Sequence, residues 1–242
     1  MTDRKLLAVS HDAKTVKGEK LGILTGVMYL APNDVSGYQV CPKATTGCKA
    51  ACLYTAGRGR FTQTQEARIS KTVMFFEQRE LFMATLVKNI NSLVRKAAKL
   101  CMEPAVRLNG TSDIAWEKIP VTIDGVKHKS IMVAFPNIQF YDYTKIAGRK
   151  AAIALHNYHL TFSLAENNDR TAFKAIKEGY NVAVVMNLKK SDPKPITWKG
   201  YPTVDGDLSD VRFFDPAGGH IVSLTAKGDA KKDTSGFVRE IS

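Results

Sequence analysis

The chain has 242 residues and a formal net charge of +12 at pH 7, and its apolar and charged fractions are 44% and 24%. These fractions are ordinary for a globular protein. No apolar run approaches the roughly 20 residues of a membrane-spanning helix, and the first residues hold no apolar stretch typical of a secretion signal. We therefore expect a cytoplasmic protein without a membrane partner, whose cysteines stay reduced.

The positive charge indicates an anionic partner such as nucleic acid, a nucleotide cofactor or an acidic substrate. The basic residues are spread along expected helices, as at Lys88, Arg95, Lys96 and Lys99. No block of basic residues with interleaved aromatic residues stands out. A solvated basic surface therefore stays open beside a role in nucleic-acid binding.

The first sixty residues divide into three segments. Residues 1–20 are polar and rich in lysine, which predicts an irregular N-terminal arm. Residues 21–32 are apolar and favour one or two strands that end near Pro32. Residues 33–61 follow as a loop, because prolines and glycines such as Pro42, Gly47 and Gly57 favour turns.

Two helices are expected after this loop. Thr62 or Thr64 can cap a helix that runs through Phe76, with Glu66 in its first turn. Apolar residues at helical spacing predict a second helix over 79–100. Cys101 follows it, and we expect a small buried apolar side chain there, away from the metal.

Strand-like and helix-like segments then alternate, with a hairpin signal at Asp124–Gly125. The segment from Asp113 can open a helix. We expect strands at 105–110, 138–144, 159–165, 181–187 and 220–228, extended segments at 196–202 and 211–215, and helices at 145–155 and 170–178. This alternation predicts one α/β domain over 1–242 with a parallel sheet. A partial or complete parallel (β/α) barrel, with the cysteine loop after its first strand, is the first interpretation; an open doubly wound sheet is the second.

Three of the four cysteines lie within twelve residues, at Cys41, Cys48 and Cys52. Thiolates this close in sequence commonly share a soft metal, which narrows the choice to iron–sulfur, zinc or Cu(I). The C-x6-C-x3-C spacing differs from zinc ribbons, and three thiolates leave one coordination position open. Residues 33–61 are thus expected to be a metal-binding loop for a 4Fe–4S cluster, with zinc and a metal-free loop as alternatives.

Polar side chains follow the ends of the expected parallel strands, where chemistry is found in such sheets. Any one of them could instead be a cap or turn residue. The candidates are Asn109, Asp113, Asp142, Lys145, Ser163, Glu166, Asn187 and Lys227. A separate acidic segment holds Asp205, Asp207, Asp210 and Asp215. We interpret it as a turn with capping carboxylates, and a substrate or second metal site remains the alternative.

Several segments together resemble a family of bacteriophage gene products. They are the C-x6-C-x3-C-L-Y-T-A-G-R-G run, residues 107–110, residues 140–145, and the closing segments 226–228 and 236–238. The resemblance covers most of the chain from about Leu21. It implies a phage protein that works in the bacterial cytoplasm, and it supplies no reaction.

A three-cysteine loop after the first strand of a parallel barrel is also similar to radical S-adenosylmethionine enzymes. This likeness implies that the three loop cysteines hold a 4Fe–4S cluster whose open iron binds S-adenosylmethionine. It further implies that Asn109, with the nearby strand-end residues Asp113, Ser163, Asn187 and Lys227, contacts the cofactor. The usual C-x3-C-x2-C spacing is not present, and Asn109-Gly110-Thr111 stands where that superfamily has Gly-Gly-Glu.

Three functions therefore stay open. The first is an iron–sulfur enzyme with an accessible iron, acting on a small molecule or a peptide. The second is a metal-assisted hydrolase of peptide or amide bonds, such as an aminopeptidase, with Asp142, Lys145 or Glu166 as acid or base. The third is a non-catalytic nucleic-acid-binding protein with a structural cluster.

Overall fold

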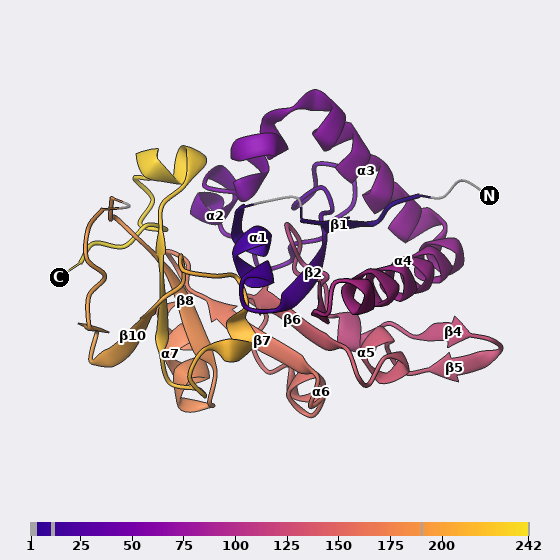
Figure 1. Ribbon diagram of the computed structural model, residues 1–242. Coiled ribbons are helices and arrows are strands. Elements are labelled where there is room, and N and C mark those ends of the chain that lie inside the picture. The colour runs from indigo at the N-terminus through magenta and orange to yellow at the C-terminus, as the bar shows by residue number, and fades with distance from the viewer. Residues whose placement is uncertain (1–3, 11–12, 190, 242) are drawn as a thin grey trace.

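A large, mostly parallel sheet forms the centre of the computed structural model, which describes residues 4–10, 13–189 and 191–241 (Figure 1). Its nine strands lie in the order β1-β2-β3-β6-β7-β8-β11-β10-β9. They are β1 (Leu7–Val9), β2 (Ile23–Met28), β3 (Glu103–Arg107), β6 (Gln139–Thr144), β7 (Tyr158–Ser163), β8 (Asn181–Met186), β9 (Thr197–Trp198), β10 (Tyr201–Asp205) and β11 (Ile221–Thr225). Strands β2 to β10 in this order pair in parallel, whereas β1 and β9 pair antiparallel at the two ends. The expected α/β class is confirmed.

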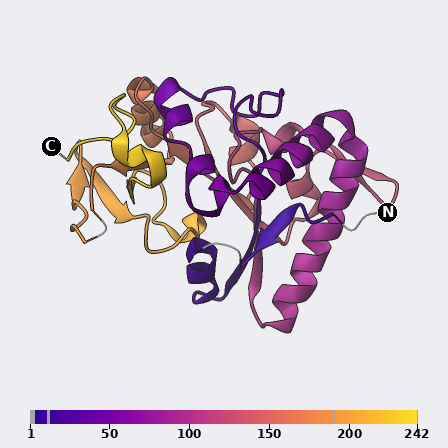
Figure 2. The same ribbon diagram turned by 90° about the horizontal axis from the view of Figure 1, so that it is seen from above.

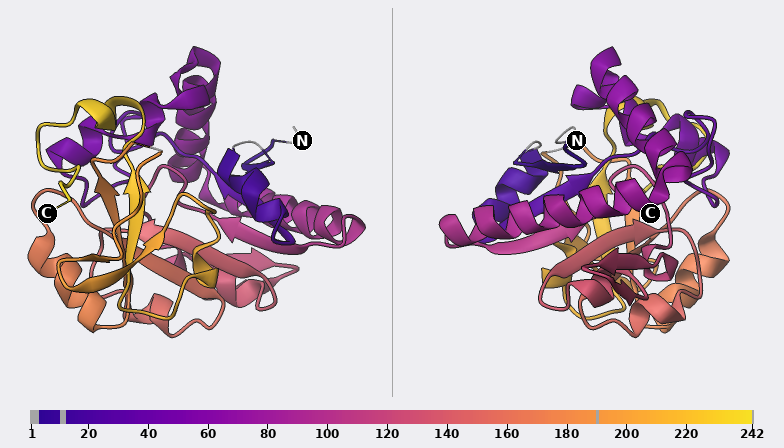
Figure 3. Two further views of the ribbon diagram at one scale, coloured as in Figure 1. Left: turned by 60° about the vertical axis from the view of Figure 1, so that its left-hand side comes forward. Right: turned by 90° about the vertical axis from the view of Figure 1, so that its right-hand side faces the viewer.

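The strands from β2 to β11 lie in the order in which the chain forms them. Right-handed crossovers that always step in the same direction place their helices on one face of a sheet. The α-helices of the described residues are α1 (Ala13–Glu19), α2 (Thr46–Ala50), α3 (Thr62–Glu77), α4 (Arg79–Lys99), α5 (Ile131–Ala134), α6 (Lys150–Ile153) and α7 (Asp169–Lys177). Helices α4, α6 and α7 pack on this face, and α3 rises beyond the edge of the sheet (Figure 3).

The main core lies between these helices and the sheet. Leu86, Ile90 and Leu93 recur on one side of α4 and are buried against strand residues such as Val106 and Phe140. Each such side chain contributes about 1.5–3 kcal/mol when it is fully removed from water. No helix within the described ranges combines the length and apolar character needed to cross a lipid bilayer.

A second, smaller cluster covers the opposite face of the sheet near the N-terminal ends of the strands. Ile23, Ala105 and Tyr141 contribute from three strands, and Val211 and Phe213 pack on them from a separate segment. We call this cluster the apolar floor. Residues two apart on a strand share a face, so the side chains two residues further along these strands lie next to the floor, nearer the C-terminal ends of the strands. The C-terminal ends of the strands on this face therefore remain available for a cavity.

Most of the expected elements are present. The second helix is confirmed as α4, and the hairpin forms as β4 (Val121–Ile123) and β5 (Val126–His128), with Asp124 and Gly125 both at positive φ. The strands expected at 138–144, 159–165, 181–187 and 220–228 correspond to β6, β7, β8 and β11. The segment after Asp113 forms only a 3-10 turn at Trp116–Lys118.

Four expectations about local structure are wrong. Residues 1–20 are not an irregular arm, because β1 pairs with β2 and α1 follows; residues 1–3 and 11–12 lie outside the described part. Cys101 is exposed rather than buried, with a φ of 53° just after α4, so it lies where the helix ends. Residues 211–215 are not extended but contain a 3-10 turn at Arg212–Phe214. The helix expected at 145–155 shortens to α6, since Gly148 at φ 69° breaks its first half.

Candidate functional site

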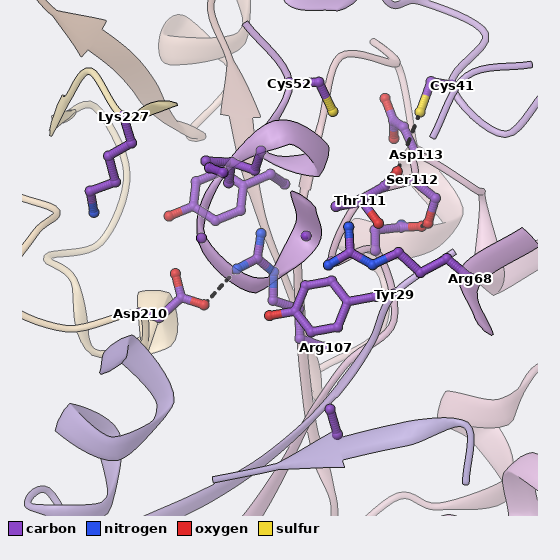
Figure 4. Close-up of a pocket in the computed structure, with 18 of the residues that line it drawn as sticks. Tyr29, Cys41, Cys52, Arg68, Arg107, Thr111, Ser112, Asp113, Asp210 and Lys227 are labelled. Atoms are coloured by element: carbon purple, nitrogen blue, oxygen red, sulfur yellow. Dashed lines mark hydrogen bonds and ion pairs between the residues drawn. The ribbon is translucent and has the colours of Figure 1, made fainter. Parts of the chain in front are cut away.

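A cavity of about 1480 Å³ lies at the C-terminal ends of the parallel strands, and residues of α3 and α4 contribute to its lining. Figure 4 shows the side chains that surround it. Eight of the eleven residues expected from the sequence line this one space: Cys41, Cys48, Cys52, Asn109, Asp113, Lys145, Ser163 and Lys227. Asp142, Glu166 and Asn187 are outside its lining.

The cysteine loop is held in place by a short helix and one carboxylate. Thr45 caps α2, and its hydroxyl accepts a hydrogen bond from the backbone N–H of Cys48 at 3.3 Å. Glu166 accepts from the Thr45 hydroxyl and from the Gly47 N–H, both at 2.7 Å. A carboxylate at the N-terminus of a helix satisfies donors that have no partner within the helix. Glu166 therefore fixes the loop and does not face the cavity.

The C-terminal part of the chain lies against the same loop (Figure 2). Ala51 packs against Ala226 and Ala230, and a side chain at Gly47 would collide with the Ser235 hydroxyl. Gly47 is thus required by the close approach of two segments that are distant in sequence. The loop is therefore held from two sides, by this C-terminal segment and by Glu166.

The three loop cysteines are free thiols, half-buried, at one end of the cavity. In Figure 4 the sulfur atoms of Cys41 and Cys52 both point toward the cavity. Burial raises the pKa of Cys41 to about 11, and the neighbouring Cys52 and Cys48 add to the increase, whereas a hydrogen bond from the Asn33 N–H opposes it. Burial also raises the pKa of Cys52, against the effects of Lys145 and Arg68 among others. The thiols are thus close enough to affect each other's ionisation, and a bound cation would favour their thiolate forms.

Among the described residues, the loop cysteines do not form a ready-made site around a single metal ion. Within the described ranges, no group of three or more His, Cys, Asp or Glu side chains is arranged to hold one metal ion. This arrangement does not fit a preformed mononuclear site of the structural zinc type, in which four ligands surround one ion. Sulfur ligands of a four-iron cluster bind different irons and therefore need not converge on one point.

Asn109 and Asp142 form the centre of a buried hydrogen-bond network at the end of β3. The Asn109 N–H donates to Asp142 at 2.6 Å, and the Asn109 side-chain oxygen accepts from the Trp116 indole at 3.1 Å. Tyr158 donates to the other Asp142 oxygen at 2.9 Å. Burial raises the pKa of Asp142 to about 7, although the hydrogen bonds from Asn109 and Tyr158 lower it. Asp142 is fully buried on the helix-packed side of β6, so it holds Asn109 and does not face the cavity.

Asp113 and Lys145 meet beside the cysteines. Asp113 accepts hydrogen bonds from the Thr144 hydroxyl and the Lys145 N–H, both at 2.7 Å, and burial raises its pKa. The Lys145 ammonium lines the cavity 5.8 Å from the centre of the Phe237 ring. Asn187 lies away from this site and donates to Glu240 at 3.0 Å.

The acidic segment at 205–215 forms both a turn and ion pairs. Asp205 accepts from the Asp207 N–H at 2.8 Å, as expected of a capping carboxylate. Asp207 also pairs with Lys194 at 3.1 Å and with Lys227 at 2.9 Å. Its carboxylate therefore neutralises Lys227, which lines the cavity, and Lys194, which is outside the lining.

Sequence reasoning missed the basic residues inside the cavity. Arg68 on α3 and Arg107 at the end of β3 both line it, as do Tyr29 and Tyr143. Arg107 forms an ion pair with Asp210 at 2.5 Å. A charged residue inside an apolar strand was a signal for Arg107, because burying a charge is costly unless it is paired or functional. No comparable signal marks Arg68 among the polar residues of its helix.

The chain matches the model of the Gene product 88 family over residues 4–241 and therefore belongs to that family. The match is consistent with the phage gene-product family that the sequence resembles. No curated protein and no solved structure matches the chain.

Proposed function

We propose that this protein is an iron–sulfur enzyme in which Cys41, Cys48 and Cys52 bind a 4Fe–4S cluster in the bacterial cytoplasm. The supporting observation is that three free thiols from one loop line a single large cavity at the C-terminal ends of parallel strands. This is the edge of a parallel sheet where binding and catalytic groups gather. When bound, the cluster would supply one-electron chemistry and one iron without a cysteine ligand.

The strand order supports a partial (β/α) barrel as the scaffold. From β2 to β11 the strands follow chain order, and their helices lie on the outer face. A sheet wound in one direction curves around its inner face, whereas a doubly wound sheet reverses its order near the middle. The cysteine loop follows β2, the first strand of this series, as expected for an architecture related to radical S-adenosylmethionine enzymes.

The surrounding residues of this chain have separate tasks in the proposal. Glu166 and Thr45 orient the loop, and Asp142 orients Asn109 at the cavity wall. Of the three side chains first considered as acid or base, Lys145 is the one that lines the cavity, and we assign it proton exchange with a substrate. Lys145 also places positive charge near the Cys52 thiol, which favours an anionic cluster.

Metal-assisted hydrolysis has less support. Asp142 and Glu166, two of the three side chains considered as its acid or base, lie outside the cavity lining and already accept hydrogen bonds from other residues. A general base must come within hydrogen-bond reach of the proton that it abstracts.

Iron content tests the proposal directly. Protein purified or reconstituted without air should be brown and contain about four irons per chain. The triple variant C41A/C48A/C52A should lose this iron, and the C101A variant should keep it, because Cys101 is exposed and outside the cavity lining. Equal iron in the wild type and the triple variant, or none in either, would overturn the proposal. Cleavage of S-adenosylmethionine by the reduced protein then tests whether this cofactor is used.

A further inference from the structure

Two arginines on the cavity wall are arranged to bind an anion. Arg68 is 8% exposed, and its Nε and Nη1 atoms have no hydrogen-bond partner. Arg107 pairs with Asp210 through Nη1, but its Nε is buried without a partner. Figure 4 shows the two guanidinium groups pointing toward a common space next to Tyr29. Both residues line the cavity, and their unpartnered nitrogen atoms are buried in its wall.

The charge on Arg68 is not neutralised by the protein. No carboxylate in the part of the chain that the structure describes forms an ion pair with Arg68. Its guanidinium carbon instead lies 4.9 Å from the centre of the Tyr29 ring and 5.5 Å from that of Tyr54. Ring faces offset only part of the cost of burying a cation. A guanidinium kept in this state is suited to a ligand that brings its own negative charge.

A lysine next to Arg68 increases the positive charge of this wall. The Lys71 ammonium donates to the Leu6 carbonyl at 3.1 Å and lines the same cavity. Burial lowers the pKa of Lys71 to about 8, and the positive charges of Arg68 and Arg4 lower it further. Among the described residues, eight basic and three acidic side chains line the cavity. The cavity lining therefore has an excess of positive charge, which favours an anion with more than one negative charge.

We propose that Arg68 and Arg107 form a subsite for a phosphate group of the substrate, on the cavity wall beside the cysteine loop. A phosphate ester carries a charge of about −1.5 to −2 near pH 7 and several acceptor oxygens. Guanidinium groups bind such oxygens in pairs, through parallel hydrogen bonds. The substrate class is therefore a phosphorylated small molecule that fits a space of about 1480 Å³. Its role in catalysis rests on the proposed function, whereas its binding does not.

Thermal unfolding with inorganic phosphate tests the subsite. At about 100 times the dissociation constant, phosphate should raise the Tm of the wild type by roughly 5–11 °C relative to sodium chloride of equal ionic strength. The R68M variant should lose this shift, and without phosphate its Tm should equal or exceed that of the wild type, because a buried unpaired charge has been removed. The R95M variant changes an exposed arginine of α4 outside the cavity and should respond to phosphate as the wild type does.

Two further measurements keep the test decisive. The R107K variant retains a cation for Asp210 but loses the planar donor pair, so phosphate should bind about tenfold more weakly. Succinate at equal ionic strength should give no comparable rise in Tm, and a rise equal to that with phosphate would overturn the assignment to phosphate. A phosphate shift that persists in R68M would also overturn it.

Iron and phosphate are measured separately, so the two proposals can fail separately. The C41A/C48A/C52A variant should lose iron and still bind phosphate. The R68M variant should bind as much iron as the wild type and lose the phosphate response. Loss of phosphate binding in the triple cysteine variant would contradict a subsite formed by Arg68 and Arg107.

Discussion

Replacement of Glu166 by alanine tests how the cysteine loop is held. The change removes two hydrogen bonds at 2.7 Å, from the Thr45 hydroxyl and the Gly47 N–H. A hydrogen bond to a charged group contributes about 1.5–3 kcal/mol, and we take the lower end because Glu166 is only half-buried. The loss is then about 3 kcal/mol, which corresponds to a fall in Tm of roughly 6–12 °C for a chain of this size.

Two readouts distinguish loosening of the loop from global unfolding. Thermal unfolding reports the total loss, and amide hydrogen exchange of residues 45–52 reports opening of the loop itself. Iron uptake by E166A should fall together with protection of these amides. The E178A variant is the matched control, because Glu178 is an exposed glutamate at the end of α7 and its loss should change stability by less than about 0.5 kcal/mol.

The E166Q variant separates a positioning role from acid–base catalysis. Glutamine keeps an oxygen that accepts from Gly47 and gains an N–H₂ group that can donate to the Thr45 hydroxyl. We expect E166Q to keep most of the stability and the iron of the wild type. The reasoning is refuted if E166A matches E178A in stability and exchange, or if E166Q abolishes turnover while the loop remains protected.

Three other substitutions follow from buried groups and close contacts. The Asp142 pKa is raised from 3.8 to about 7, so between these pH values the folded state holds a proton that the unfolded state releases. The free energy of unfolding should therefore fall as pH rises from about 4 to 7, and urea titrations of D142N should not show this fall. The Lys71 pKa is lowered from 10.5 to about 8, so the free energy of unfolding should rise between about pH 8 and 10.5, and chemical denaturation of K71M should show no such rise. The G47A variant places a methyl group against Ser235 and should lower stability by about 1–3 kcal/mol, measured by calorimetry; an unchanged Tm would contradict the close approach of the two segments.

The sequence predicted which strand ends surround the site but not which face each side chain occupies. Tyr143 lines the cavity, whereas its neighbour Asp142 is buried on the helix side. Successive strand residues point to opposite faces of the sheet. An error of one residue in the expected alternation therefore assigns a side chain to the wrong face. An apolar strand buried on both faces has no alternation that would set this parity.

The position of the loop cysteines at the cavity was predictable, because the loop directly follows an expected parallel strand. Arg68 was not, since a position on α3 becomes part of the cavity only through the path that the chain takes after the loop. The contact between Gly47 and Ser235 depends in the same way on residues far apart in sequence. Local periodicity carries no information on such contacts, whereas it was sufficient for α4 and the hairpin.

The apolar floor packs directly beneath strand residues that line the cavity. The Tyr141 and Phe213 rings meet with their centres 5.4 Å apart, two residues below Tyr143 on the same face. A smaller residue at either position would leave a void in this apolar cluster. These two rings therefore support the strand residues above them from below, and their packing keeps Arg107 and Tyr143 at a fixed height in the cavity wall.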